Sequence, residues 1–350
     1  MATRARTKIA IRPPAETVGI VGAGSWGTTL AAHVAGAGHG VVVWDVDPAV
    51  VREIRTKHTN PRSLPKVRLD RSIRATSDLG ELAAATHTLM LAVPSTAMRE
   101  VLVALGPHVR ADHLVIHTTK GLERGTAARM TEIVRDETCC KRFGVLSGPN
   151  LAPEVLAKQP SAAVIASRYP EVIDAAQRFL VRPFFRVYGS TDVVGVELGA
   201  AVKNVLSLAM GFVAGMGLGQ NTRSLIVTRG LAEMIRIGVR LGADAATFNG
   251  IAGIGDLIGS GMSRESANFA VGELIAHGRK LDAALREVGH FAEGVPTADA
   301  LDTLLQRTPV DAPLSRGVYQ VLYRGAATTD VLESLMTRPP TMESHAHTAS

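Results

Sequence analysis

The sequence is poor in cysteine. It contains two cysteines in 350 residues, Cys139 and Cys140, and they are adjacent in the chain. This arrangement lacks the spacing of a disulfide framework or of a cysteine-ligated metal site, so we predict a protein without a metal. Few cysteines and no disulfide pattern are typical of a reducing compartment, and we therefore expect a cytoplasmic protein.

Aromatic residues and long apolar runs are also scarce. Phe, Trp and Tyr make up 4% of the chain, and no long basic stripe accompanies the formal net charge of +6. A small ligand that carries phosphate fits this charge as well as a nucleic acid does, and we predict no nucleic-acid partner. The apolar stretches are strand-sized or broken by glycine and charge, so we predict no membrane span.

The two ends of the chain differ from its middle. Residues 1–16 carry four basic side chains but lack the apolar core of a secretory signal. We expect them to form a flexible tail, with an organelle-targeting segment as the alternative. Residues 337–350 are polar and are expected to form a second flexible tail. The length between them predicts two domains, at residues 17–192 and 193–336.

A glycine-rich turn follows the first predicted strand, residues 17–21. Gly22, Gly24 and Gly27 have the spacing Gly-x-Gly-x-x-Gly, and a helical, alanine-rich stretch comes directly after them. The first glycine permits a tight turn, the second lets the backbone approach a pyrophosphate, and the third lets helix pack on strand. The pattern predicts a dinucleotide site. The alternative is a glycine-rich turn in an unrelated doubly wound protein.

An acidic residue ends the second predicted strand, residues 41–45. Asp45 lies about 20 residues after the glycines, where a carboxylate accepts the hydroxyls of the adenosine ribose and repels an additional phosphate. It favours NAD over NADP as the cofactor, with NADP as the second option. The alternative interpretation is a turn aspartate before Pro48.

Further strands alternate with helical stretches as far as about residue 190. We expect them at residues 89–93, 114–117, 143–147, 162–166 and 184–188. This alternation predicts a Rossmann-like, doubly wound parallel sheet, with Lys120 near the strand end where such sheets bind ligands. After Thr191 the pattern becomes helical, including a predicted loop at residues 211–221. The predicted fold class is therefore α/β, with an all-α C-terminal domain.

The helical half begins with an apolar run, residues 195–204, that contains Lys203. On a helix its neighbours would be Val196, Gly199 and Ala200, which leave room for a bulky group beside the ammonium. A lysine there is costly unless it is paired with an anion or acts as a neutral base. The alternative is a lysine that extends to solvent from the edge of a core helix.

Three polar residues farther along the helical half have two interpretations each. Asp256 either belongs to a site or caps the helix that follows it. Ser266 and Asn268 either belong to the same site or are ordinary cap and turn residues.

Several motifs occur in the order typical of one family. They are Gly22–Gly27, Ala92–Ser95, Thr119–Glu123, Ser147–Pro149, Gly195–Asn204, Thr228–Met234 and Gly253–Leu257. Together they resemble the NAD(P)-dependent glycerol-3-phosphate dehydrogenases of the soluble bacterial type, over residues 17–335. The resemblance implies reversible hydride transfer between dihydroxyacetone phosphate and sn-glycerol 3-phosphate, which feeds glycerophospholipid synthesis. We also expect a homodimer, since helical second domains of this kind commonly pair.

The resemblance assigns roles to individual residues. Lys203 corresponds to the proton-transferring lysine, and Lys120 to a lysine that contacts substrate and cofactor. The other substrate-binding positions are Gly148, Asn150 (usually Ser or Thr in the family), Asp256, Ser266 and Asn268. The other cofactor-contacting positions are Ser25, Trp26, Ala152, Phe291 and Glu293. We expect burial and Lys120 to lower the pKa of Lys203, and Asp256 to oppose them.

Two departures from the family pattern affect these expectations. Ala267 and Phe269 stand where the family usually has arginines, the first of which contacts the substrate phosphate and the cofactor. Arg264, about one helical turn earlier, is the candidate substitute. Val46 stands where NADP-binding members often carry arginine, which strengthens the preference for NAD. The departures keep two alternatives open: a dehydrogenase of a less anionic hydroxy compound, and a catalytically weak sensor that binds the dinucleotide.

Overall fold

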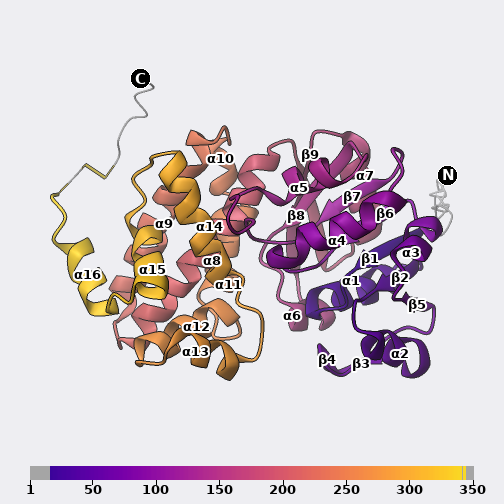
Figure 1. The fold of residues 1–350 in the computed structure, drawn as a ribbon, viewed down its shortest axis with the longest axis horizontal. Helices are drawn as coiled ribbons and strands as arrows, with labels where there is room; N and C mark the ends of the chain where they lie inside the picture. The colour runs from indigo at the N-terminus through magenta and orange to yellow at the C-terminus, as the bar shows by residue number, and fades with distance from the viewer. Residues whose placement is uncertain (1–15, 341, 344–350) are drawn as a thin grey trace, which may run out of the picture.

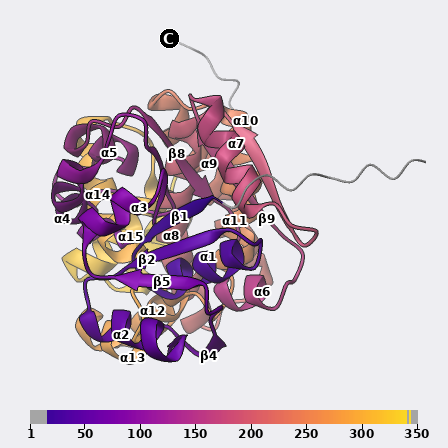
Figure 2. The ribbon, with the colours of Figure 1, turned by 90° about the vertical axis from the view of Figure 1, so that its right-hand side faces the viewer.

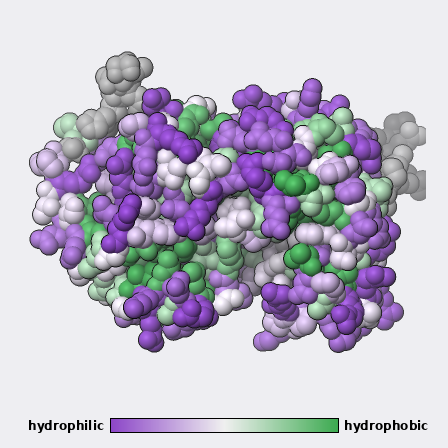
Figure 3. Space-filling model, viewed as in Figure 1, coloured by the Kyte–Doolittle hydropathy of each residue, from purple (hydrophilic) through white to green (hydrophobic). Residues whose placement is uncertain are grey.

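A sheet of eight strands forms the first half of the computed structural model, and helices form the second half (Figure 1). The structure describes residues 16–340, 342 and 343. Nearly all of the first predicted tail and most of the second lie outside the described residues. On the face seen in Figure 3, the surface is mostly hydrophilic and is notched between the two halves.

The sheet has the strand order β10-β9-β8-β7-β6-β1-β2-β5. Its strands are β1 (Thr17–Val21), β2 (Gly40–Trp44), β5 (Ile73–Thr76), β6 (Thr88–Leu91), β7 (Leu114–His117), β8 (Arg142–Ser147), β9 (Ser161–Ser167) and β10 (Phe185–Ser190). A separate antiparallel pair consists of β3 (Thr59–Asn60) and β4 (Leu64–Arg68). The sequence analysis did not predict β3, β4 or β5.

The predicted Rossmann-like parallel sheet is confirmed, with one departure at an edge. The six strands from β5 to β8 are parallel neighbours, but β9 pairs antiparallel with β8, and β10 runs parallel to β9. The link from β8 to β9 contains only the five-residue helix α6 (Ala152–Leu156), which packs against α1. It returns at the same end of the sheet instead of crossing a sheet face, so the direction of the next strand reverses.

Helices cover both faces of the sheet (Figure 2). They are α1 (Ser25–Ala35), α2 (Pro48–Lys57) and α7 (Pro170–Leu180) on one apolar layer, and α3 (Leu79–Ala85), α4 (Met98–Leu105) and α5 (Met130–Glu137) on the other. Side chains of β1 alternate between the layers, with Ile20 in the first and Val21 in the second. Burial on both faces explains why the strands are continuously apolar.

Helix α8 (Val193–Gly215) is the centre of the second half, and almost all of its side chains are buried. Around it lie α9 (Gln220–Arg240), α10 (Ala245–Phe248), α11 (Asp256–Gly261), α12 (Ala267–Ala276), α13 (Leu281–Val288), α14 (Gly294–Arg307), α15 (Pro313–Arg324) and α16 (Thr328–Met336). The predicted loop at residues 211–221 is shorter, because α8 continues to Gly215. Its glycines allow close contact with α12: a Cβ at Gly215 would lie 2.6 Å from the carbonyl oxygen of Glu273.

Among the described residues, α8 is long and apolar enough to cross a membrane by length and composition. The expectation that no apolar run reaches this length is therefore wrong. Of its most apolar 18-residue window, 94% is buried inside the protein. The helix is the core of the second half, which accounts for its composition.

Candidate functional site

The glycine-rich turn joins β1 to α1 at the centre of the sheet. Gly22 has φ +102°, a backbone conformation that favours glycine, and a Cβ there would lie 2.7 Å from the carbonyl oxygen of Ala92. A Cβ at Gly27 would overlap the carbonyl oxygen of Gly22. Both glycines therefore permit the close packing of α1 on β1 and β6.

Gly24 differs from these two glycines because it faces open space. A Cβ at Gly24 would meet no protein atom within 4 Å, and no side chain caps α1 at this residue. The first turn of a helix carries unpaired N–H groups and a partial positive charge, which suit a phosphate. The turn therefore fits the pyrophosphate of a dinucleotide.

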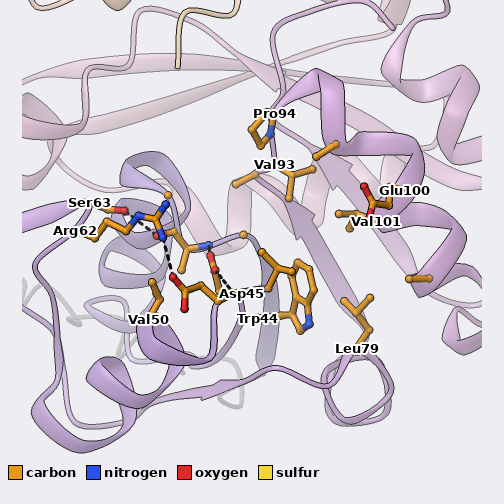
Figure 4. A pocket seen from close by; sticks show the side chains of 18 residues that line it. Trp44, Asp45, Val50, Arg62, Ser63, Leu79, Val93, Pro94, Glu100 and Val101 are labelled. Atoms are coloured by element: carbon orange, nitrogen blue, oxygen red, sulfur yellow. Dashed lines mark hydrogen bonds and ion pairs between the residues drawn. The ribbon is translucent and has the colours of Figure 1, made fainter. Parts of the chain in front are cut away.

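A groove of about 470 Å³ lies beside this turn (Figure 4). It is lined by the glycine turn, the ends of β2 and β6, and parts of α2, α3 and α4. Its lining residues are Gly22, Ala23, Gly24, Trp44, Asp45, Val46, Asp47, Val50, Arg62, Ser63, Leu79, Ala92, Val93, Pro94, Ala97, Glu100, Val101 and Ala104. Mainly apolar walls with a few placed polar groups are typical of a site for a small organic ligand.

Asp45 holds the turn in place as well as lining the groove. Its Oδ2 accepts a hydrogen bond from the backbone N–H of Ala23 at 2.8 Å, and its Oδ1 accepts one from that of Asp47 at 2.9 Å. Asp47 in turn pairs with Arg62 at 2.8 Å, and both residues line the groove. Binding of the ribose by these carboxylates stays a prediction. The sequence analysis did not predict Arg62.

The β3–β4 pair also holds the glycine-rich turn in place, through two hydrogen bonds. Asn60 Nδ2 donates to the carbonyl oxygen of Ala23 at 2.7 Å, and Ser25 Oγ donates to that of Ser63 at 2.9 Å. No sequence signal identified Asn60, because its partner lies 37 residues earlier. Ser25 thus contributes to the architecture of the turn, beside its predicted contact with the cofactor.

The predicted cofactor residues divide into two groups. Gly22, Gly24 and Asp45 line the groove. The others lie outside its lining, and they are Ser25, Trp26, Gly27, Lys120, Ala152, Phe291 and Glu293.

Glu293 is placed where the two halves of the chain meet. Its Oε1 accepts a hydrogen bond from the backbone N–H of Ser95, after β6, at 3.1 Å. A Cβ at Gly121 would clash with the same oxygen. Burial raises the pKa of Glu293 to about 7, against the opposing effect of the hydrogen bonds from Ser95.

Two lysines share one buried carboxylate where the two halves of the chain meet. Lys203 Nζ lies 3.2 Å from Oδ1 of Asp256, and Lys120 Nζ lies 2.6 Å from its Oδ2. Lys120 also donates to the carbonyl oxygen of Gly148 at 2.7 Å. Asp256 is 0% exposed and the side chain of Lys203 is 6% exposed. The alternative interpretation of Lys203, a lysine that extends to solvent from the edge of a core helix, is therefore wrong.

Burial lowers the pKa of Lys203 to about 8. Asp256 opposes this effect by its negative charge, and Lys120 reinforces it by its positive charge. These are the causes and directions expected from the sequence. A lysine with a pKa near neutrality can both donate and accept a proton under ordinary conditions.

Asp256 does not cap a helix. It is the first residue of α11, after a π-helical turn at Ile251–Gly255, and the N-cap position belongs to Gly255. Ser266 does occupy an N-cap position, that of α12, but without a side-chain capping bond. Its Oγ lies 3.3 Å from Oγ of Ser207 on α8.

A chain of amide hydrogen bonds joins the two halves next to the lysines. Asn204 Nδ2 donates to the carbonyl oxygen of Lys120 at 2.7 Å, and Asn268 Nδ2 donates to Asn204 Oδ1 at 2.9 Å. The backbone N–H of Gly294 then donates to Asn268 Oδ1 at 2.8 Å. Asn204 was not among the predicted site residues, although its position next to Lys203 in an apolar run was a signal.

The remaining substrate candidates lie on or near the same junction. Gly148 has φ +144°, and Asn150 Nδ2 donates to the carbonyl oxygen of Ala162 at 2.9 Å. Arg264 is directed elsewhere: its side chain is 78% exposed and pairs with Glu273 at 2.7 Å. Phe269 is buried in the helical core. Within the described residues, no cluster of His, Cys, Asp or Glu could hold a metal ion.

A groove beside a glycine-rich turn on a Rossmann-like sheet, together with a buried lysine where the sheet meets a helical half, is typical of an NAD(P)-dependent dehydrogenase. Two family descriptions narrow this class. NAD-dependent glycerol-3-phosphate dehydrogenase N-terminus matches residues 17–173, and the C-terminus of the same family matches residues 192–333. The chain belongs to the NAD-dependent glycerol-3-phosphate dehydrogenase family.

Individual relatives of the chain carry the name of the same family. The glycerol-3-phosphate dehydrogenase (NAD(P)+) of Geobacter metallireducens is 42% identical over 94% of this chain and 99% of its own length. That of Frankia casuarinae is 42% identical over 92% of this chain and 96% of its own length. The crystal structure of glycerol-3-phosphate dehydrogenase from Coxiella burnetii matches with a TM-score of 0.90 at 32% identity, covering 93% of this chain and 100% of that one.

We predict that Gly24→Ala weakens NADH binding without destabilising the protein. The extended backbone of Gly24 (φ −65°, ψ −178°) accepts alanine, and the new methyl group meets only open space. We expect the pyrophosphate to approach through that space, so NADH affinity should fall about tenfold or more, or about 1.4 kcal/mol. The measurements are a fluorescence titration with NADH and thermal unfolding without ligand.

Gly219→Ala is the matched control for this variant. Gly219 is likewise an extended N-cap glycine with nothing within 4 Å of an added Cβ, but it begins α9 in the helical domain. NADH affinity should be unchanged in this control. Equal affinities of Gly24→Ala and the parent protein would contradict the proposed position of the pyrophosphate.

Proposed function

We propose that this chain reduces dihydroxyacetone phosphate to sn-glycerol 3-phosphate, and catalyses the reverse oxidation, with a nicotinamide dinucleotide. The observation that carries the proposal is the Lys203–Asp256–Lys120 arrangement at the junction of the two domains. The family match and the names of the relatives supply the substrate pair. We further propose that the product enters glycerophospholipid synthesis.

Lys203 is the proposed acid–base residue. When bound, the dinucleotide supplies the hydride for carbon 2 in the reduction and accepts it in the oxidation. Protonated Lys203 donates the proton to the carbonyl oxygen in the reduction, and neutral Lys203 removes it from the hydroxyl in the oxidation. Asp256 keeps the ammonium form accessible in a buried site because its charge raises the pKa of Lys203.

The proposed substrate groups surround Lys203. Lys120 adds a second positive charge, which suits the anionic substrate, and it reaches both Asp256 and the turn at Gly148. Ser266, Asn150 and Asn268 complete the proposed substrate site. Such groups lower the barrier by orientation and by electrostatic stabilisation.

We propose NAD as the preferred cofactor. The end of the groove that would receive the adenosine ribose carries Asp45, Asp47 and Val46. Two carboxylates there disfavour the additional phosphate of NADP. Arg62 already pairs with Asp47 and is therefore less available to bind that phosphate.

Two broader properties belong to the same proposal. We propose a cytoplasmic enzyme, in line with the family and with the two free thiols, Cys139 and Cys140. We also propose a homodimer, which is the common arrangement of helical second domains of this kind.

A dehydrogenase of a less anionic hydroxy compound is the second candidate function. The observation that favours it is the absence of the usual arginine at Ala267, together with the outward direction of Arg264. Loss of a bidentate phosphate contact weakens binding by about 1.5–3 kcal/mol per charged hydrogen bond. Lys120 and the N-terminus of α12 are the groups left for the phosphate.

We predict that Lys203→Ala lowers turnover by about 10²–10⁴-fold, the usual contribution of a general acid–base. NADH binding should persist, because Lys203 lies outside the lining of the groove. The measurements are kcat with dihydroxyacetone phosphate and an NADH titration. Near-normal turnover would contradict the acid–base role, and a parent protein that binds NADH but turns over no triose phosphate would favour the sensor.

The pH dependence follows from the pKa of Lys203, which is about 8. Reduction needs the protonated lysine, so its kcat should fall as pH rises above this value. Oxidation needs the neutral lysine, so its kcat should fall below it. Because Asp256 raises the pKa of Lys203, Asp256→Asn should move both limbs to lower pH. Unchanged limbs in this variant would assign the titration to another group.

We predict a higher kcat/KM with NADH than with NADPH, because of the carboxylates at the ribose end of the groove. Repulsion between these carboxylates and the additional phosphate of NADPH should give a difference in kcat/KM of about tenfold or more. Parallel assays with each cofactor at saturating dihydroxyacetone phosphate measure it. An equal or reversed ratio would contradict the proposed role of Asp45.

We predict that Ala267→Arg lowers the KM for dihydroxyacetone phosphate about tenfold, by restoring a charged contact to the phosphate. Ala267→Gln, which adds length without charge, is the control. The assays compare dihydroxyacetone phosphate with dihydroxyacetone. No change in KM for either substrate would place the phosphate elsewhere, and a parent protein that prefers the uncharged ketone would support the second candidate function.

A further inference from the structure

Glu197 is a buried carboxylate that the proposed chemistry does not use. Its side chain is 2% exposed, on the first half of α8, six residues before Lys203. Four donors converge on it. Oε1 accepts from the backbone N–H of Thr131 at 2.8 Å and faces His117 Nε2 at 3.1 Å; Oε2 accepts from Arg129 Nη1 and Thr131 Oγ1, both at 2.7 Å.

All four donors belong to the sheet domain. His117 is the last residue of β7, while Arg129 and Thr131 lie at the beginning of α5. Glu197 thus bonds α8, which carries Lys203, to the end of β7. Lys120 lies in the loop after β7, three residues after His117. The two lysines meet on Asp256, so their separation depends on how α8 lies against β7.

The energetics make this a firm attachment. Burial alone would raise the pKa of Glu197, but the hydrogen bonds and charges of His117 and Arg129, with the N–H of Thr131, outweigh it and lower the pKa. The carboxylate is therefore ionised, and any shift of α8 would leave a buried charge without its donors. Breaking a buried, hydrogen-bonded ion pair by removing one partner is strongly destabilising.

We propose that Glu197 is a positioning residue, which holds α8 against β7 and α5 so that Lys203 stays buried beside Lys120 and Asp256. This proposal rests on the proposed acid–base role of Lys203 for its effect on turnover. The placement of Lys203 itself is independent of any substrate.

Titration of Lys203 reports on this placement directly. The charged groups facing Lys203 are Asp256 on α11 and Lys120 after β7. Glu197 faces the titratable His117 and the charged Arg129, which also pairs with Glu132. Burial is the largest cause of the low pKa of Lys203. A loosened α8 admits water, so the pKa should rise from about 8 toward its ordinary value of 10.5.

The test is Glu197→Gln, which keeps the shape of the side chain but turns one acceptor into a donor. We expect the ¹⁵Nζ resonance of Lys203, in protein labelled at lysine and assigned with Lys203→Arg, to titrate at higher pH than in the parent. We also expect kcat to fall about tenfold to a hundredfold, the size of effect that a small misplacement causes. The KM for NADH should change little, and Glu197→Asp should recover part of kcat.

Glu233→Gln is the matched control. Glu233 on α9 is also a buried carboxylate, 0% exposed, and it accepts backbone hydrogen bonds from Leu314 and Ser315 at 2.9 and 2.8 Å. It anchors the start of α15, away from the lysines. Its replacement should lower the thermal stability while leaving the Lys203 titration in place.

A second variant covers the case in which Glu197→Gln does not fold. Thr131→Val removes the hydroxyl donor to Glu197, together with a long contact of that hydroxyl to Arg129 Nη1 at 3.4 Å, and keeps the shape of a side chain that is 3% exposed. It should shift the titration in the same direction by a smaller amount. If folded Glu197→Gln or Thr131→Val titrates at Lys203 as the parent does, Glu197 is merely structural and the proposal is overturned.

The two readouts separate this proposal from the proposed function. A shifted Lys203 titration in a protein that turns over no dihydroxyacetone phosphate supports the positioning role and contradicts the proposed reaction. An unshifted Lys203 titration in an enzyme that turns over dihydroxyacetone phosphate contradicts the positioning role and supports the proposed reaction.

Discussion

The structure depends most on one buried carboxylate shared by two ammonium groups. Asp256 lies within hydrogen-bonding distance of both Lys120 and Lys203, and it is fully buried. Isolated charges are costly in such an environment, and two cations with one anion leave a net positive charge there. Burial, reinforced by the charge of Lys120, keeps the pKa of Lys203 low against the opposing charge of Asp256. The excess positive charge suits an anionic ligand. The same three side chains therefore supply the electrostatics on which both the proposed binding and the proposed proton transfer depend.

The rest of the fold serves to bring these groups together. Lys120 follows a sheet strand, Lys203 lies on the central helix, and Asp256 begins a short helix after a π-helical turn. The chain of amides through Asn204 and Asn268 then ties the loop, the two helices and the start of α14 to one another. Because every link crosses between elements, the site forms only when both domains are packed.

The sequence analysis was most successful where the signal is local. The turn at Gly22–Gly27 was predictable because the strand, the glycines and the helix follow one another directly. Lys203 was a candidate because it is a single charge in an apolar run. The reversal of β9 was not predictable, since strand direction depends on which end of the sheet the link from β8 reaches. Asn60 and Asn204 were not predicted because their hydrogen-bond partners lie 37 and 84 residues away in the chain.

The sequence by itself therefore determined the glycine-rich turn, the lone lysine in an apolar helix and the change from a sheet-containing half to a helical half. These features follow from periodicity and from backbone sterics within short stretches. Only the tertiary structure decided that Asp256 pairs with both lysines and that Arg264 turns toward Glu273. The physical reason is that ion pairing and desolvation depend on distance and burial in space. Lys120 and Asp256, for example, are 136 residues apart in the chain.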